Sequence, residues 1–252
     1  MQPSRVLAHM QGPRSNMGEP KANRLLAALE PDDFDQLAPY LETVDLPLGC
    51  ILVEHGAPIE RIYFPQTCII SVIAVLHDGA GPEMAIVGPD GMLGFLPYLT
   101  DREAYGRYVV QVPGRASRIG IDNLEPVLAR RPQISQTFFC FLEAFLTQTL
   151  QSVACNAVHP VEARCCRWLL MTRDRLRRDD LPLTHEFLGA MLGVQRPTVS
   201  ATTRLLQSAG LIEQRRGVIT VLDPTGLREA ACECYGHIRS RIERLLPRAY
   251  CD

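Results

Sequence analysis

The clearest pattern of apolar and polar positions lies in the segment Leu183–Val221. It predicts two short helices around a tight turn, followed by a β-hairpin. Thr184 is a suitable N-cap for the first helix, and Gly193 supplies the turn that ends it. The second helix opens at Arg196-Pro197, because proline is tolerated in a first helical turn, and it ends just before Gly210.

The second predicted helix has two unlike faces. At about 100° per residue, one face gathers Thr198, Val199, Thr202, Leu205 and Leu206. The opposite face gathers Arg196, Pro197, Ser200, Ala201 and Arg204 and holds no acidic residue. Arginine pairs with guanine O6 and N7 in the major groove, and small residues permit close approach. The candidate DNA-binding residues of this helix are therefore Gln195, Arg196, Thr198, Ser200, Ala201 and Arg204.

A basic turn, Gln214-Arg215-Arg216-Gly217, and a β-rich run, Val218–Val221, come next. Two arginines at a hairpin tip beside a recognition helix are well placed to contact phosphates, so Arg215 and Arg216 join the candidates. One alternative is an ordinary helical hairpin with a solvated polar face, which the basic wing disfavours. Another is a winged helix that binds protein, which an acidic recognition face would favour.

The front of the chain has a different pattern of residues. Residues 1–20 are rich in Gly, Pro, Ser, Asn and Gln and predict a disordered tail, and Asn23–Ala38 predicts a short helical segment. From Val44 to Ile121, β-branched runs are separated by Gly and Pro every 8–12 residues. This spacing is typical of a β-sandwich or jelly roll. A short helix over Leu124–Arg130 follows.

A long helix is predicted over Pro132–Ala157, with two apolar stripes. One stripe consists of Phe139, Leu142, Leu146, Thr149 and Val153, and the other of Phe138, Phe141 and Phe145. A helix with two apolar stripes needs two partners, which here are its own β-rich domain and the same helix of a second subunit. We therefore expect a homodimer joined through the first stripe. A single wide stripe facing one core is the alternative.

Charge divides the chain into the same parts. The net charge is −2 overall, but residues 161–252 hold 15 Arg and no Lys against 11 acidic residues, and residues 1–160 hold 11 basic and 17 acidic residues. The rear is thus about +4 and the front −6, so only the rear suits phosphate. We expect a sensor domain over 21–131, a dimerisation helix over 132–159 and a DNA-binding domain over 160–252.

Nine cysteines, an odd number, form no regular framework. We find no signal segment and no apolar run near 18 residues, so we expect free thiols, a cytoplasmic location and no membrane partner. Cys165-Cys166 and Cys232-x-Cys234 are too close for a usual zinc pair and are interpreted as buried small hydrophobes or helix-surface thiols. We expect no metal and no cofactor.

Catalytic motifs do not support an enzyme. A cupin would need His-x-His on its strands, whereas the β-rich region offers only His55 and His77. No nucleophile elbow, P-loop or His-Glu-x-x-His is present. A cupin-type metalloenzyme is therefore an unfavoured alternative, and we expect no enzymatic activity.

The order of helix, β-roll, long helix and winged helix-turn-helix resembles the bacterial cyclic-AMP receptor/Fnr (Crp–Fnr) family of transcription regulators. The resemblance covers about residues 23–225 and is strongest over Leu188–Ile212, where the helix-turn-helix aligns without a gap; the glycines of Leu46–Cys68 also follow the family. It implies an α+β fold with an N-terminal cyclic-nucleotide-binding-like β-roll (jelly roll), a long dimerisation helix and a C-terminal winged helix-turn-helix. It also implies a homodimer on a palindromic operator, with RNA polymerase and a small-molecule effector as further possible partners.

The chain departs from the family where cyclic nucleotides bind. Family members that bind them present a Glu from a Gly-Glu-Leu turn to the ribose and an Arg to the phosphate. Here the turn is Gly94-Phe95-Leu96-Pro97, and Arg107-Tyr108 lies near the phosphate position. Each missing charge-assisted hydrogen bond costs roughly 1.5–3 kcal/mol. The candidate pocket residues are Gly94, Phe95, Leu96, Arg107 and Tyr108.

We therefore expect a sequence-specific transcription regulator that cyclic AMP does not control. A regulator of the same fold that responds to a cyclic nucleotide or another small ligand is the alternative. An iron–sulfur cluster is not expected, because no cysteine precedes Cys50. The family's Arg-Glu-x-x-x-Arg pattern in the recognition helix becomes Arg196 through Ala201, which keeps only the first Arg and implies a different DNA site.

Overall fold

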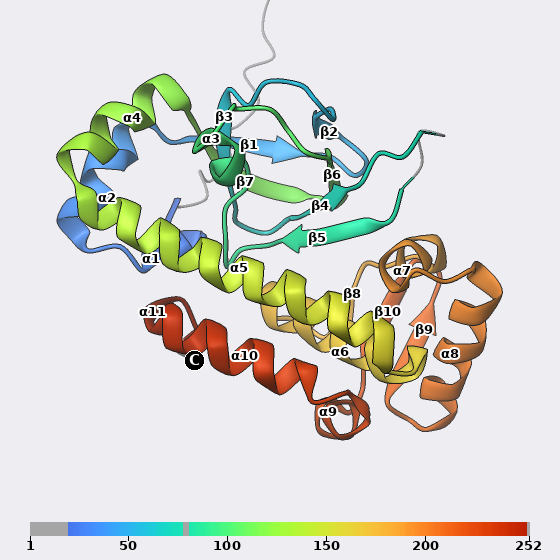
Figure 1. Cartoon of the computed structure of the whole chain (residues 1–252). Coiled ribbons are helices and arrows are strands. Elements are labelled where there is room, and N and C mark those ends of the chain that lie inside the picture. The colour runs from blue at the N-terminus through green and yellow to red at the C-terminus, as the bar shows by residue number, and fades with distance from the viewer. Residues whose placement is uncertain (1–19, 78–80, 251–252) are drawn as a thin grey trace, which may run out of the picture.

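The computed structural model describes residues 20–77 and 81–250 (Figure 1), so the predicted tail lies almost entirely outside the described residues. The first helical segment is two short helices, α1 (Arg24–Ala27) and α2 (Pro31–Leu37), rather than one, with 3-10 turns at Pro20–Ala22 and Ala38–Tyr40. The break falls at Pro31, which begins α2 and lacks the N–H that a continuous helix would need. Asn23 caps α1 by accepting from the Leu26 N–H.

The β-rich region folds as two antiparallel sheets, as the turn spacing predicts. Its strands are β1 (Glu42–Leu46), β2 (Ile51–Val53), β3 (Arg61–Pro65), β4 (Ile69–Ile73), β5 (Glu83–Val87), β6 (Arg107–Val112) and β7 (Gly114–Gly120). One sheet has the order β1-β7-β3 and the other β2-β6-β4-β5. The short helix α3 (Phe95–Tyr98) lies beside them. Apolar side chains from both sheets, α1 and α2 form the first core. This architecture confirms the predicted β-roll.

The long helix α5 (Pro132–Val158) follows α4 (Ile121–Arg130) and crosses below the β-roll in Figure 1. The residues that α5 buries recur every three, four or seven positions and are Ile134, Phe138, Phe141, Ala144, Gln148 and Cys155. The second predicted stripe therefore faces the chain's own core, with Phe145 partly buried against it.

The sequence expectation of no long apolar run needs a correction at α5. This helix is long and apolar enough, by length and composition, to cross a membrane, and only 28% of its most apolar stretch is buried inside the chain. Phe139, Leu146 and Val153 of the first stripe are 45%, 56% and 66% exposed. Leu150, which sequence reasoning did not include, is exposed on the same side. The chain thus leaves one apolar face of α5 open.

The rear of the chain begins at α6 (Val161–Leu176), directly after Pro160, whose extended backbone separates α6 from the long helix. Its remaining elements are β8 (Asp180–Leu181), α7 (His185–Leu192), α8 (Arg196–Ser208), β9 (Ile212–Arg215), β10 (Val218–Val221) and α9 (Pro224–Ala230). The strands form a small sheet in the order β8-β10-β9. Trp168 and Leu169, together with the apolar sides of α7 and α8, build a second core.

The C-terminal helices return to the front of the molecule. α10 (Cys234–Leu245) runs alongside α5, and α11 (Pro247–Tyr250) contacts α1 (Figure 1). Ile238 and Ile242 belong to the second core, whereas Leu246 and Ala249 belong to the first. The end of the predicted rear domain, 160–252, therefore packs against the front as well.

Candidate nucleic-acid interface

The helix-turn-helix has the local geometry that the sequence predicts. Thr184 Oγ1 accepts from the Phe187 N–H at 3.2 Å, which caps α7. Gly193 ends α7 with a φ of 63°, a left-handed conformation that favours glycine. Gly210 follows α8 with a φ of 74°. These three positions fix where α7 begins and ends and where α8 ends.

The side chains that hold α8 against the rear core are Val199, Thr202, Thr203 and Leu206. Gly189 of α7 lets the turn before α8 pack closely on α7, because a Cβ there would lie 3.0 Å from the Val194 carbonyl oxygen. Of the face that gathers Val199, two members, Thr198 and Leu205, are exposed, whereas Thr203, which the projection did not include, is buried. The projection assumes an isolated ideal helix, whereas the actual buried stripe is set by how α8 is seated on α6 and α7.

His185 joins three parts of the motif, a role that sequence reasoning missed. Its Nδ1 lies 3.1 Å from Ser200 Oγ, and its Nε2 lies 3.4 Å from Thr203 Oγ1 and within hydrogen-bonding reach of Gln214 Nε2. One ring in the first turn of α7 thus fixes α8 and the strand β9 that leads to the wing. The only sequence signal was a polar ring placed directly after the N-cap.

The structure places the predicted DNA-binding residues on one open surface of α8. Gln195, Arg196, Thr198, Ala201 and Arg204 are exposed. Ser200 is half-buried because its hydroxyl faces His185. Arg204 Nε donates to the Ser200 carbonyl at 3.1 Å, which holds that guanidinium along the helix. Among the described residues, no hydrogen bond or ion pair holds the side chain of Arg196.

The wing is a two-residue hairpin. Arg215 of β9 pairs in register with Val218 of β10, which leaves Arg216-Gly217 as the turn. Gly217 has a φ of 75°, a left-handed conformation that favours glycine. The Arg215 side chain is 75% exposed and lies 3.2 Å from both carboxylate oxygens of Glu213. The wing therefore presents two arginines, one of which is paired in the absence of DNA.

The five candidate pocket residues do not converge on one space. Phe95 is 2% exposed, and its ring packs edge-on against Phe138 of α5 with centroids 5.1 Å apart. Tyr108 is also buried, whereas Leu96 is exposed. Arg107 Nε lies 2.7 Å from Glu54 Oε2 on the surface. Gly94 turns the chain with a φ of 96°.

Known proteins support the rear of the chain as a DNA-binding domain. Residues 163–230 match the family model of a Crp-like helix-turn-helix domain. A CRP-like cAMP-activated global transcriptional regulator of Mycobacterium tuberculosis (strain CDC 1551 / Oshkosh) is 23% identical over 214 residues, covering 82% of this chain and 96% of that protein. A global nitrogen regulator of Synechococcus elongatus is 24% identical over 187 residues, covering 69% of this chain and 82% of that protein.

Solved structures share the fold. The c-di-GMP responsive global regulator CLP of Xanthomonas campestris superposes with a TM-score of 0.64 at 15% identity, covering 77% of this chain and 100% of that one. FixK2 of Bradyrhizobium japonicum gives a TM-score of 0.64 at 15% identity, covering 76% of this chain and 98% of that one. These similarities confirm the predicted order of β-roll, long helix and helix-turn-helix.

Proposed function

The chain belongs to the Crp–Fnr family of DNA-binding transcription regulators, and on that premise we propose that it reads a palindromic operator as a homodimer. The observation that carries the proposal is the open face of α8. Arg196 stands there without a partner among the residues that the structure describes, beside small residues and next to the basic wing. This combination suits insertion into a major groove.

The roles of the side chains follow from where they stand. Arg196 opens α8, where its guanidinium reaches a guanine with two hydrogen bonds. Arg215 and Arg216 sit on the wing and contact phosphates, which position the domain but read no base. His185 is a positioning residue, because it acts through Ser200, Thr203 and Gln214 rather than on DNA.

The open face of α5 supports the dimer. Phe139, Leu146, Leu150 and Val153 recur three, four or seven residues apart on the exposed side of the helix. A second copy of α5 packed against them would bury this apolar stripe as a coiled coil does. Two-fold symmetry would then place the two recognition helices about 34 Å apart, one turn of DNA.

We propose that the effector is not cyclic AMP. Relatives and structural neighbours are named for different signals, including cAMP and c-di-GMP, so the fold does not specify one. In this chain Phe95 fills the core against Phe138, and Arg107 is paired with Glu54 on the surface. Another small ligand or none is the alternative. We further propose that the protein acts in the cytoplasm on transcription by RNA polymerase and that it catalyses no reaction.

The proposal is tested by selecting bound duplexes from a random DNA pool with the full chain. We expect an inverted repeat whose half-sites lie about one helical turn apart. The matched control is a selection with Arg196→Ala, which should blur one base pair in each half-site. Recovery of unrelated sequences, or of no DNA above a no-protein background, contradicts the proposal.

A further inference from the structure

Four side chains of metal-binding type meet where the end of α5 approaches the start of α10. The sulfur atoms of Cys155, Cys232 and Cys234 and a ring nitrogen of His159 all lie within 4.8 Å of one another. Cys155 Sγ lies 3.4 Å from Cys232 Sγ, and Cys234 Sγ lies 3.6 Å from His159 Nδ1. A tetrahedral zinc ion with Zn–S bonds of about 2.3 Å holds its ligand atoms roughly 3.5–3.8 Å apart. The cluster therefore already has nearly the spacing of a zinc site.

The backbone presents these ligands in two short units. Cys155 and His159 are four residues apart at the end of α5. The backbone N–H of His159 donates to the backbone carbonyl of Cys155 at 3.0 Å, so the helical turn continues to His159 and both side chains lie on one face. Cys232 and Cys234 flank Glu233 at the start of α10, where the chain turns into the helix. Each unit supplies two ligands, and 77 positions separate Cys155 from Cys232.

The surroundings of the cluster orient its ligands. The three thiols are buried, whereas the His159 ring is partly exposed at one side. His159 Nε2 lies 3.2 Å from Glu233 Oε1. A carboxylate that accepts the Nε2–H leaves the lone pair of Nδ1 directed at the cysteines, as in carboxylate–histidine–zinc arrangements. Gln151 Nε2 donates to Cys234 Sγ at 3.1 Å, which fixes that sulfur.

We propose that Cys155, His159, Cys232 and Cys234 together bind one zinc ion. Three sulfurs and one nitrogen complete a four-coordinate shell, which is the arrangement of a structural rather than a catalytic zinc site. Binding releases the three thiol protons as the thiolates form on the metal. The sequence alone argued against a metal, because Cys232-x-Cys234 is too short to act as a site without the two ligands that the fold brings from α5.

The position of the site gives it a mechanical role. α5 carries the open apolar face, and the extended residues His159 and Pro160 separate it from α6 and the recognition helix. A metal that bridges the last turn of α5 to the start of α10 adds coordinate bonds between these helices, beside the packing of α10 along α5. Zinc would therefore limit how far the DNA-binding domain can turn against the dimerisation helix.

The direct test loads the full-length, reduced chain with Co²⁺ alone and records its absorption spectrum. We expect about one ion per chain, with thiolate charge-transfer bands and the visible bands of a tetrahedral ion. Zn²⁺ should displace the Co²⁺. Cys232→Ser should lose both the stoichiometric ion and these bands, whereas Cys140→Ser, a control at a half-buried cysteine of α5, should keep them.

A second variant keeps all four ligands. Glu233→Gln should weaken Co²⁺ binding about 10–100-fold, because the carboxylate that orients His159 is gone. Failure of the reduced wild-type chain to bind Co²⁺ or Zn²⁺ overturns the proposal, and so does a Cys155–Cys232 disulfide that persists in excess reductant. DNA binding is measured separately: a chain that binds its DNA site but takes up no Co²⁺ or Zn²⁺ defeats only this inference, and a chain that binds the metal but no DNA site defeats only the proposed function.

Discussion

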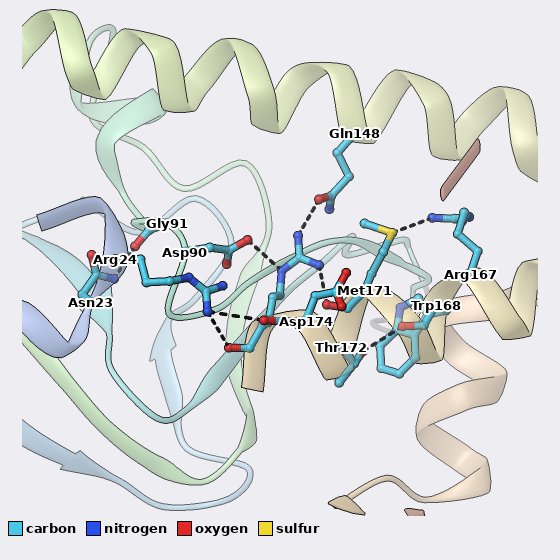
Figure 2. Close-up of polar contacts among 11 residues, drawn as sticks. Asn23, Arg24, Asp90, Gly91, Gln148, Arg167, Trp168, Met171, Thr172 and Asp174 are labelled. Atoms are coloured by element: carbon cyan, nitrogen blue, oxygen red, sulfur yellow. Dashed lines mark hydrogen bonds and ion pairs between the residues drawn. The ribbon is translucent and has the colours of Figure 1, made fainter. Parts of the chain in front are cut away.

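Arg175 of α6 forms an ion pair with Asp90, which follows β5, with 3.3 Å between Nε and Oδ2; both side chains are almost fully buried, 6% and 7% exposed. The same guanidinium donates to Gln148 Oε1 of α5 at 2.5 Å and to the Met171 carbonyl at 3.1 Å. Figure 2 shows Asp90, Gln148 and Met171 at this point, which come from the turn after β5, from α5 and from α6 itself. Gly88 leaves room for the stem of the arginine, since a Cβ there would lie 3.0 Å from Arg175 Cδ.

A second arginine joins the same two parts of the chain from the other side. Arg24 of α1 donates through Nη1 to the carbonyls of Asp174 and Arg175, both at 3.3 Å, near the C-terminal end of α6. A cation suits that end of a helix, where carbonyls lack helical partners. The front of the chain is thus joined to α6 by one buried ion pair and by an arginine that donates to two helix-terminal carbonyls.

Asp90→Asn should destabilise the fold by about 3–5 kcal/mol, because it leaves the Arg175 charge buried without its carboxylate. Urea unfolding followed by circular dichroism measures the change. Asp179→Asn is the matched control: Asp179 pairs with Arg173 at 2.6 Å but is half exposed, so its substitution should cost less than about 1 kcal/mol. Equal effects of the two substitutions would contradict the role given to the buried pair.

Glu83 should make stability fall as the pH rises. Burial raises the pKa of its carboxyl from 4.5 to about 8, against the lowering effects of Ser71 and Arg175. The folded chain therefore holds a proton that the unfolded chain has released, so stability declines between about pH 4.5 and pH 8, and the full decrease is present above that range. Glu83→Gln keeps the neutral form and should flatten this slope, making the variant more stable than the parent at pH 8. Identical pH profiles of unfolding would refute the assignment.

The predictability of each feature follows the range of the interactions that create it. Thr184, Gly193 and Gly210 act on their own neighbours, so the sequence sufficed to place the helix-turn-helix. The two stripes of α5 could also be predicted from the sequence, because a helix repeats its faces at a fixed spacing. Long-range packing could not be predicted in this way: the exposure of Leu205 depends on how α8 packs on the rest of the domain. The grouping of Cys155 with Cys232 likewise depends on where α10 returns to α5.

Leu146→Glu should convert the proposed dimer to a monomer and abolish tight operator binding. Leu146 is exposed in the middle of the α5 stripe, where two copies would face each other across the two-fold axis and place like charges together. Light scattering gives the mass of each form. Leu48→Glu, the same change at an exposed leucine of the β-roll, should stay dimeric. A dimer that survives Leu146→Glu places the subunit contact elsewhere.

Cyclic AMP should neither bind the chain measurably nor change its affinity for DNA. Phe95, which the resemblance aligns with the ribose-binding Glu, packs against Phe138, and Arg107 is paired with Glu54. Isothermal titration calorimetry at millimolar nucleotide, followed by DNA binding with and without it, checks both statements. Saturable binding that tightens the DNA complex would show that another group replaces the missing Glu.

Arg196 and Arg215 should fail in different ways when each is replaced by alanine. Arg196 opens the recognition helix and is free to reach the groove floor, so Arg196→Ala should cost about 1–3 kcal/mol on the best site and relax preference at one base pair per half-site. Arg215 must exchange Glu213 for a phosphate, so Arg215→Ala should weaken binding to all sequences alike. It should also lower the slope of log affinity against log salt concentration by about one for each phosphate that is no longer neutralised.

Arg244→Ala, the same removal of charge on the exposed side of α10, is the control and should change neither the sequence preference nor this slope. Binding isotherms across salt concentrations and single-base site variants separate these outcomes. If Arg196→Ala leaves sequence preference intact, α8 does not read the bases through this residue, and the proposed recognition mode is wrong.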